Sequence, residues 1–271
     1  MSFFTTVFTN PLFLRGAVIG ILVSLCAALL GVCLVLRRCS MIGDGLSHMA
    51  FGTLSIAVAL GFAPLAVTIP VVMLAAFFLL RISESSSIKG DSAIALISST
   101  SLAVGVAASS FGGVTKSVDG YMFGSIWLVE KSEMYICIPL AVAVIMIFIL
   151  CYHDIFLVTF DEDFAKASGI NVDAYKTVTA LLTALVVVIG MRIMGTLLIS
   201  SLVIFPALTA MRVFKSFRSV VICAASVSVL AFTAGFALSF FSGMPTGASI
   251  VIADALFFAA FFVAGKIWGR S

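Results

Sequence analysis

Two side chains that can bind a metal ion lie inside the second apolar segment of the sequence. Asp44 and His48 are four residues apart, so on an α-helix both side chains lie on one face, one turn apart. Carboxylate oxygen and imidazole nitrogen suit divalent first-row ions such as zinc, manganese or iron. Met41 and Ser55 extend the same helical face. The spacing predicts a metal contact at Asp44 and His48, with Met41 and Ser55 along the pathway of the ion.

The same pair also fits a structural role. Asp44 can cap the start of its helix, and His48 can form a hydrogen bond to a neighbouring helix. Two ligands do not complete a tight site, which needs one or two more from another helix or a second subunit. A transport path, in contrast, can combine few protein ligands with water so that the ion leaves again. The spacing alone leaves both interpretations open.

The composition places this pair in a membrane protein. The chain has 271 residues, of which 62% are hydrophobic and 10% charged, and this is more apolar surface than a soluble domain can bury. Its apolar blocks are long enough to cross a hydrocarbon core of roughly 30 Å as helices. We expect an all-α polytopic membrane protein with about eight or nine transmembrane helices in one domain, residues 1–271. The predicted spans are 16–36, 41–60, 62–80, 92–111, 134–151, 175–190, 193–210, 219–241 and 247–264.

Three places in this pattern are irregular. The second span carries Asp44 and His48, and the sixth and seventh spans are short and split by Arg192. Either place can contain a broken or re-entrant helix. The stretch from Gly112 to Lys131 is too short and too rich in glycine to span the membrane. We expect an interfacial loop with aromatic anchors there.

Basic residues indicate the orientation of the chain. With the N-terminus outside and the C-terminus in the cytoplasm, eleven lysines and arginines fall on the cytoplasmic side and four on the other. This bias follows the positive-inside rule. The basic residues are confined to short connections and form no tail, so we expect no nucleic-acid partner. The cytoplasmic set comprises Arg37, Arg38, Arg81, Lys89, Lys166, Lys176, Arg212, Lys215, Arg218, Lys266 and Arg270.

A third ionisable residue lies within a predicted span. Asp254 falls in the last apolar block, and a charge inside a membrane helix costs several kcal/mol. It is therefore a candidate pathway residue. Pairing with serine or threonine on neighbouring helices is the alternative.

The largest predicted cytoplasmic connection covers residues 152–174. Asp161, Glu162 and Asp163 open a short stretch that passes Ala165 and ends at Gly169. An acidic start and a glycine stop are typical of a helix. We expect a short helix on the cytoplasmic surface, although composition alone favours a solvated loop.

The chain lacks a motif for hydrolysing ATP. The segment GGVTKS at 112–117 has neither the glycine before lysine nor the strand-to-helix context of a phosphate-binding loop. Any ATP would be hydrolysed by a partner subunit.

Four segments in register resemble the permease subunits of the zinc and manganese ABC-transporter family. The segment LRRCSMIGDGLSHMAFG at 36–52 is similar to that family's arginine pair followed by a glycine-aspartate and histidine pattern. FDEDFAKASGI at 160–170 resembles its ATPase-contacting loop. GTLLISSLVIFPALTA at 195–210 and MPTGASIV at 244–251 resemble its late-helix signatures. The resemblance covers nearly the whole chain.

This resemblance implies a multi-pass permease of the inner or plasma membrane with an ABC importer permease-like bundle. The expected partners are a second copy of the chain, cytoplasmic ATP-binding subunits and an extracellular or periplasmic metal-binding protein. Asp44 and His48 occupy the positions that contact metal in such permeases. Asp161, Glu162, Asp163, Ala165 and Gly169 belong to the coupling loop. The metal would be cargo, with no permanently bound cofactor and no covalent chemistry.

Two other classes of protein fit parts of the sequence. An ion-coupled secondary transporter could use Asp44 and Asp254 as a relay, but the inverted internal repeat common in such carriers is not found. A membrane metalloenzyme is disfavoured, because a hydrolytic site needs three protein ligands and a base, and the chain has only two histidines.

Overall fold

The computed structural model describes residues 10–85, 90–111, 124 and 131–267 of the chain, and every regular element in this part is a helix. The long helices begin at ordinary helix-start signals. Asn10, for example, accepts a hydrogen bond from the Leu12 amide and is followed by Pro11. The helices are α2 (Pro11–Leu36), α3 (Met41–Ala59), α4 (Pro64–Ser85), α5 (Gly90–Phe111), α7 (Lys131–Leu150), α8 (Tyr152–Phe160), α9 (Glu162–Ala167), α10 (Val172–Met194), α11 (Thr196–Met211), α12 (Phe217–Ser242) and α13 (Thr246–Ile267).

Five of the described helices are long and apolar enough to cross a membrane: α2, α4, α10, α12 and α13. The bent pair α7 and α8 makes a sixth candidate. The apolar parts of α5 and α11 are shorter, and α3 contains Asp44 and His48. The all-helical membrane architecture is confirmed. The predicted count of eight or nine spans is not, because three of the predicted spans correspond to shorter or more polar helices.

Helix α2 lies at the centre of the bundle. It packs against α7, α10, α11 and α12, and its middle is almost wholly buried. Two polar contacts fix it to its neighbours: the Ser228 hydroxyl donates to the Ser24 carbonyl at 2.9 Å, and the Cys26 thiol donates to the Ala141 carbonyl at 3.5 Å. Such side-chain to backbone bonds between helices are a common form of association within membranes.

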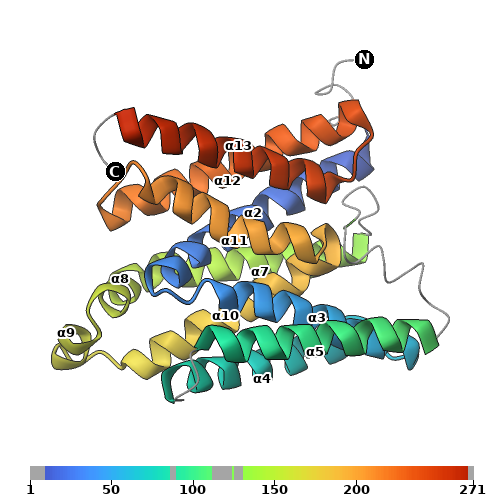
Figure 1. Ribbon diagram of the computed structural model, residues 1–271, viewed down its shortest axis with the longest axis horizontal. Coiled ribbons are helices and arrows are strands. Elements are labelled where there is room, and N and C mark those ends of the chain that lie inside the picture. Colours follow the sequence, from blue (N-terminus) through green and yellow to red (C-terminus); the bar gives the residue numbers. More distant parts are fainter. Residues whose placement is uncertain (1–9, 86–89, 112–123, 125–130, 268–271) are drawn as a thin grey trace.

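The remaining helices lie on two sides of this centre. Figure 1 shows α12 and α13 along one edge of the bundle and α3, α4 and α5 along the opposite edge. Helices α8 and α9 project at one end, which we call the α9 end. The long helices alternate in direction, so that α2 begins at the far end and α13 finishes at the α9 end (Figure 1).

The breaks and bends of the helices differ from those predicted from the sequence. Helix α3 is continuous from Met41 to Ala59, and α10 and α11 are separate helices that meet at Gly195, whose φ is 91°. The bend lies instead between α7 and α8, where the axis turns by 69°. The short helix predicted between Asp161 and Gly169 is α9, and a further helix that was not predicted, α8, precedes it. The predicted loop from Gly112 to Lys131 lies almost entirely outside the described residues.

Glycines allow the helices to approach closely. A Cβ atom on Gly31 of α2 would lie 1.9 Å from the Val203 carbonyl oxygen of α11. On α3, a Cβ atom on Gly52 would lie 2.4 Å from the Ser101 carbonyl oxygen of α5. Both obstacles are backbone atoms, which cannot rotate away. Glycine is therefore required at these two crossings.

Replacing Gly31 by alanine should destabilise the bundle. The new methyl group would overlap the backbone of α11, and overpacking of this kind costs about 1 to 3 kcal/mol. Gly43→Ala is a matched control, because its Cβ would meet the Val203 side chain at 3.3 Å. We expect a clearly lower thermal denaturation midpoint for Gly31→Ala than for Gly43→Ala in purified protein. Equal midpoints would contradict the close approach of α2 and α11.

Candidate functional site

Asp44 and His48 lie side by side on α3. The Nε2 atom of His48 is 3.7 Å from Oδ2 of Asp44, and their side chains are 24% and 36% exposed. Asp44 belongs to the first turn of the helix. In Figure 1 this turn lies further into the bundle than α8, α9 and the start of α10. Arg37, which precedes α3, contacts Glu162 of α9, so the pair lies in the half of α3 nearer the α9 end.

The donor atoms of this pair are not used by the rest of the described protein. The distance of 3.7 Å is too long for a hydrogen bond, and the buried Nδ1 atom of His48 has no partner among the described residues. The residue at the N-cap position of α3 is Ser40, not Asp44. Neither structural interpretation of the pair, helix cap or satisfied interhelical bond, is supported by these contacts.

The other faces of α3 are closed by neighbouring helices. A Cβ atom on Gly45 would lie 2.6 Å from the Ile94 side chain of α5. The Ser47 hydroxyl accepts or donates a hydrogen bond at 3.1 Å with Ser200 of α11. Ser47 and Ser200 thus place a polar contact next to the Asp44–His48 pair. The sequence gives no direct signal for this contact between helices distant along the chain.

Met41 and Ser55 differ in their surroundings. Met41 is 41% exposed at the start of α3. Ser55 is fully buried, and its hydroxyl donates to the Phe51 carbonyl of the same helix at 2.8 Å. Met41 is therefore accessible next to the pair, whereas the Ser55 hydroxyl is already satisfied within its own helix. The face of α3 that carries Met41, Asp44, His48 and Ser55 is accessible only in the first two turns of the helix.

Asp254 is buried apart from the pair. It lies on α13, which packs against α11 and α12, while α3 packs mainly against α4, α5, α10 and α11. The side chain is 1% exposed, and neither carboxylate oxygen has a hydrogen-bond partner in the described residues. No cluster of three or more His, Cys, Asp or Glu side chains suited to a metal occurs in that part of the chain. The alternative interpretation, pairing of Asp254 with serine or threonine, is not seen among the described residues.

Helix α9 presents two distinct faces. Asp161 caps it by accepting from the Phe164 amide at 2.9 Å, and Gly169 ends it with a φ of 83°. Ala165 is fully buried and packs with Val158 and Val172. The outward side chains are Asp163, Phe164 and Lys166, and Phe164 is 57% exposed.

Glu162 joins α9 to the body of the bundle. Its carboxylate accepts a hydrogen bond from buried Lys176 of α10 at 2.7 Å and lies 3.5 Å from the guanidinium of Arg37 at the end of α2. One side chain thus connects three elements. Glu162 is one of the predicted coupling residues, but the sequence indicates neither this connection nor the exposure of Phe164.

Comparisons with known proteins agree with the architecture. Residues 9–264 match the ABC 3 transport family. The chain is 30% identical to the manganese import system permease protein ScaB of Streptococcus gordonii over 94% of this chain and 92% of that protein. It is also 30% identical to the high-affinity zinc uptake system membrane protein ZnuB of Buchnera aphidicola, over 88% and 91% of the two chains.

A solved structure shares the fold over almost the whole chain. The structure of PsaBC from Streptococcus pneumoniae in complex with Fab superposes with a TM-score of 0.86 at 28% identity, covering 96% of this chain and 94% of that one. A putative metal-chelate type ABC transporter in an inward-facing conformation, 18% identical with a TM-score of 0.75, shares the fold. The match of sequence and fold over nearly all residues leads to one conclusion: this chain belongs to the ABC 3 transport family.

Proposed function

We propose that this chain is the membrane permease of an ATP-driven importer for a divalent transition-metal ion, and that Asp44 and His48 contact the ion. The observation that carries the proposal is the adjacent carboxylate and imidazole on α3, whose donor atoms have no other role in the described protein. Relatives named for manganese import and zinc uptake support the class of cargo. Zinc, manganese and iron all accept such ligands.

One ion can contact both side chains at their present separation. Metal bonds to imidazole nitrogen and carboxylate oxygen are each about 2.0 to 2.2 Å long. The distance of 3.7 Å between Nε2 of His48 and Oδ2 of Asp44 is slightly less than the sum of two such bonds. A shared ion would also balance the Asp44 carboxylate, which is costly in an apolar bundle.

A second copy of the chain would complete the coordination. No described region of one chain brings a third His, Cys, Asp or Glu to the pair. In a homodimer whose two α3 helices face a common path, each copy supplies one carboxylate and one imidazole. Four protein ligands with exchangeable water suit an ion that must bind and then leave.

The proposed topology has nine crossings, with the α9 end in the cytoplasm. Helices of the bundle alternate in direction from α2 to α13 (Figure 1). The turns at the α9 end carry most of the described basic residues, including Arg37, Arg38 and Lys215. Arg15 lies near the start of α2 and Arg192 near the end of α10, and both of these helix ends are at the other side of the bundle. This distribution follows the positive-inside rule.

Helix α9 is the proposed contact for the ATP-binding subunits. Its exposed side chains Asp163, Phe164 and Lys166 form a short amphipathic surface at the end of the bundle. Buried Ala165 and the Glu162–Lys176 ion pair attach that surface to α8 and α10. A push on α9 would thus be transmitted to α10 and to the end of α2. Asp161 and Gly169 define the two ends of this coupling helix.

Removing either metal contact should abolish most of the transport. We expect Asp44→Asn and His48→Gln each to reduce metal uptake at least about tenfold, since each loses one ligand of an incomplete set. Asp173→Asn is the control, because Asp173 is exposed in the first turn of α10. Uptake of manganese, zinc and iron is measured in proteoliposomes with the ATPase and binding protein. Unchanged uptake in both variants would refute the site, and full uptake without the ATPase would refute ATP-driven import.

Removing the exposed phenylalanine of α9 should weaken docking of the ATPase. Phe164→Ala deletes an anchor that is 57% exposed, and such aromatic anchors dominate interfaces. The control Phe62→Ala removes a phenylalanine that is 59% exposed in the turn before α4. We expect at least about tenfold weaker association for Phe164→Ala only, at unchanged thermal stability. Normal association of Phe164→Ala would rule out α9 as the main contact.

Cysteine labelling tests the orientation. Ser168 follows α9, and Ser242 ends α12 at the other end of the bundle; both are exposed. A membrane-impermeant maleimide added to intact cells should label Ser242→Cys above the level of the native cysteines. Ser168→Cys should react only after the cells are made permeable. The reverse pattern would invert the proposed topology.

A further inference from the structure

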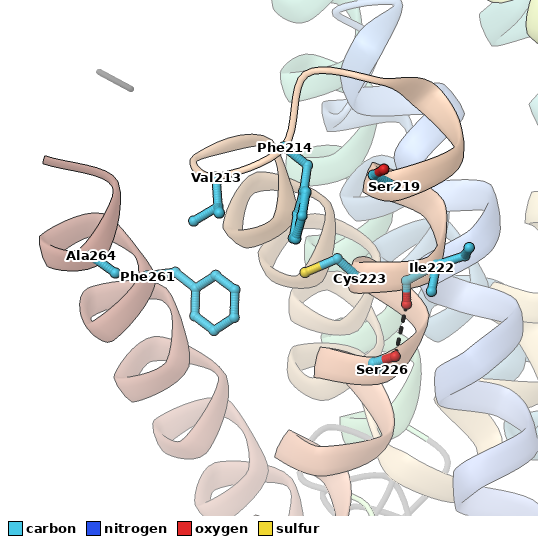
Figure 2. A pocket seen from close by; sticks show the side chains of 8 residues that line it. All are labelled: Val213, Phe214, Ser219, Ile222, Cys223, Ser226, Phe261 and Ala264. Atoms are coloured by element: carbon cyan, nitrogen blue, oxygen red, sulfur yellow. Dashed lines mark hydrogen bonds between the residues drawn. The ribbon is translucent and has the colours of Figure 1, made fainter. Parts of the chain in front are cut away.

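An apolar groove opens between α12 and α13 at the α9 end of the bundle. It has a volume of about 560 Å³, within the range of roughly 300 to 1,000 Å³ that is usual for small-ligand pockets. Figure 2 shows Phe214 on one side of the groove with Cys223 and the other α12 side chains, and Phe261 and Ala264 of α13 on the other. The lining residues are Val213, Phe214, Ser219, Ile222, Cys223, Ser226, Phe261 and Ala264.

The shape of the groove suits an acyl chain. Its α12 wall runs from Ser219 to Ser226, which is about 10 Å of helix at the usual rise per residue. The polar groups in this wall are few, and the Ser226 hydroxyl is already bonded to the Ile222 carbonyl at 2.8 Å (Figure 2). The groove therefore offers apolar contact along the helix axis and almost no hydrogen-bonding capacity.

Positive charge surrounds the end of the groove. Lys215 adjoins the lining residue Phe214, Arg218 adjoins Ser219, and Lys266 lies two residues beyond Ala264. All three side chains are exposed, and they make no ion pair within the described part of the chain. Asp254, in the middle of α13, is the only acidic residue after Asp173. The start of α12 packs against Phe160 of α8 through Phe217, and the neighbouring Asp161 caps α9.

A fourth basic residue, Arg212, helps to fix the walls of the groove. The guanidinium of Arg212 lies over the rings of Phe258 and Phe262, 5.6 and 5.1 Å from their centroids. Cation–π contacts of this kind hold the end of α11 against the last turns of α13. They fix the spacing of the walls between which Phe261 projects.

We propose that this groove binds an anionic phospholipid, with one acyl chain between α12 and α13 and the phosphate among Lys215, Arg218 and Lys266. Basic clusters at the membrane surface attract anionic headgroups, and the adjoining apolar groove adds the chain contact that a free anion lacks. The groove lies on the opposite edge of the bundle from α3 (Figure 1), so lipid can reach it without entering the Asp44–His48 path.

The test measures which lipid the full-length permease retains. The protein is loaded in mixed micelles of equimolar phosphatidylglycerol and phosphatidylcholine, and bound lipids are counted by native mass spectrometry. Three basic side chains near one phosphate predict at least about fivefold preference for phosphatidylglycerol. Equal retention of the two lipids by the wild type would overturn the proposal.

Two variants separate the headgroup contact from the chain contact. The triple change Lys215→Gln, Arg218→Gln and Lys266→Gln should remove the preference, and Ala264→Phe should reduce total retention by filling the groove with the charges still in place. The matched control Arg38→Gln, Arg81→Gln and Lys166→Gln removes the same charge elsewhere and should keep the preference.

Thermal denaturation checks that each variant is folded. A preference that survives the first triple change, or that falls equally in the control, would overturn the proposal. A photoreactive residue at Ile222 should form a lipid adduct in native membranes. A polypeptide adduct there would overturn the proposal in favour of a protein partner.

Discussion

The cost of placing a carboxylate and an imidazole among apolar helices is the constraint on which the arrangement of this protein depends. In such surroundings polar atoms need a partner, yet Asp44 and His48 lie 3.7 Å apart with donor atoms that the described protein does not use. The neighbouring faces of α3 are closed, by the glycine crossing to α5 and by Ser47 against Ser200. On the face of α3 that carries the pair, only the first turns of the helix stay open. A passing cation is the partner that we propose for these two side chains.

Contacts between helices also connect the Asp44–His48 pair to the α9 end of the bundle. Glu162 joins α9 to the buried Lys176 of α10 and to Arg37, which immediately follows α2. Helix α2 lies at the centre of the bundle and packs on α11, the helix that also touches α3. A displacement of α9 therefore has a continuous packed route toward the pair. The packing contacts along this route are part of the structure. Transmission of movement from α9 to the pair is part of the proposed mechanism.

Much of the fold could be predicted from apolar blocks and helix-stop residues. The second predicted span, 41–60, agrees with α3 (Met41–Ala59), and the eighth, 219–241, lies within α12 (Phe217–Ser242). The fifth predicted span, 134–151, ends where the axis bends, but the polar residues after Cys151 did not predict that the chain continues as helix α8. The spacing of Asp44 and His48 was visible in the sequence, but their unused donor atoms depend on tertiary contacts. Likewise, Ala165 is buried only because α9 folds back on α8 and α10.

The most direct test of the central claim is whether His48 binds the metal. The chain has only two histidines, His48 and His153, so electron spin echo spectra of the permease loaded with Mn²⁺ can assign a coordinated imidazole nitrogen without ambiguity. The account predicts a ¹⁴N signal in the wild type and in His153→Gln, and its loss in His48→Gln. A signal that persists in His48→Gln, or the absence of any nitrogen signal in the metal-loaded wild type, would contradict it.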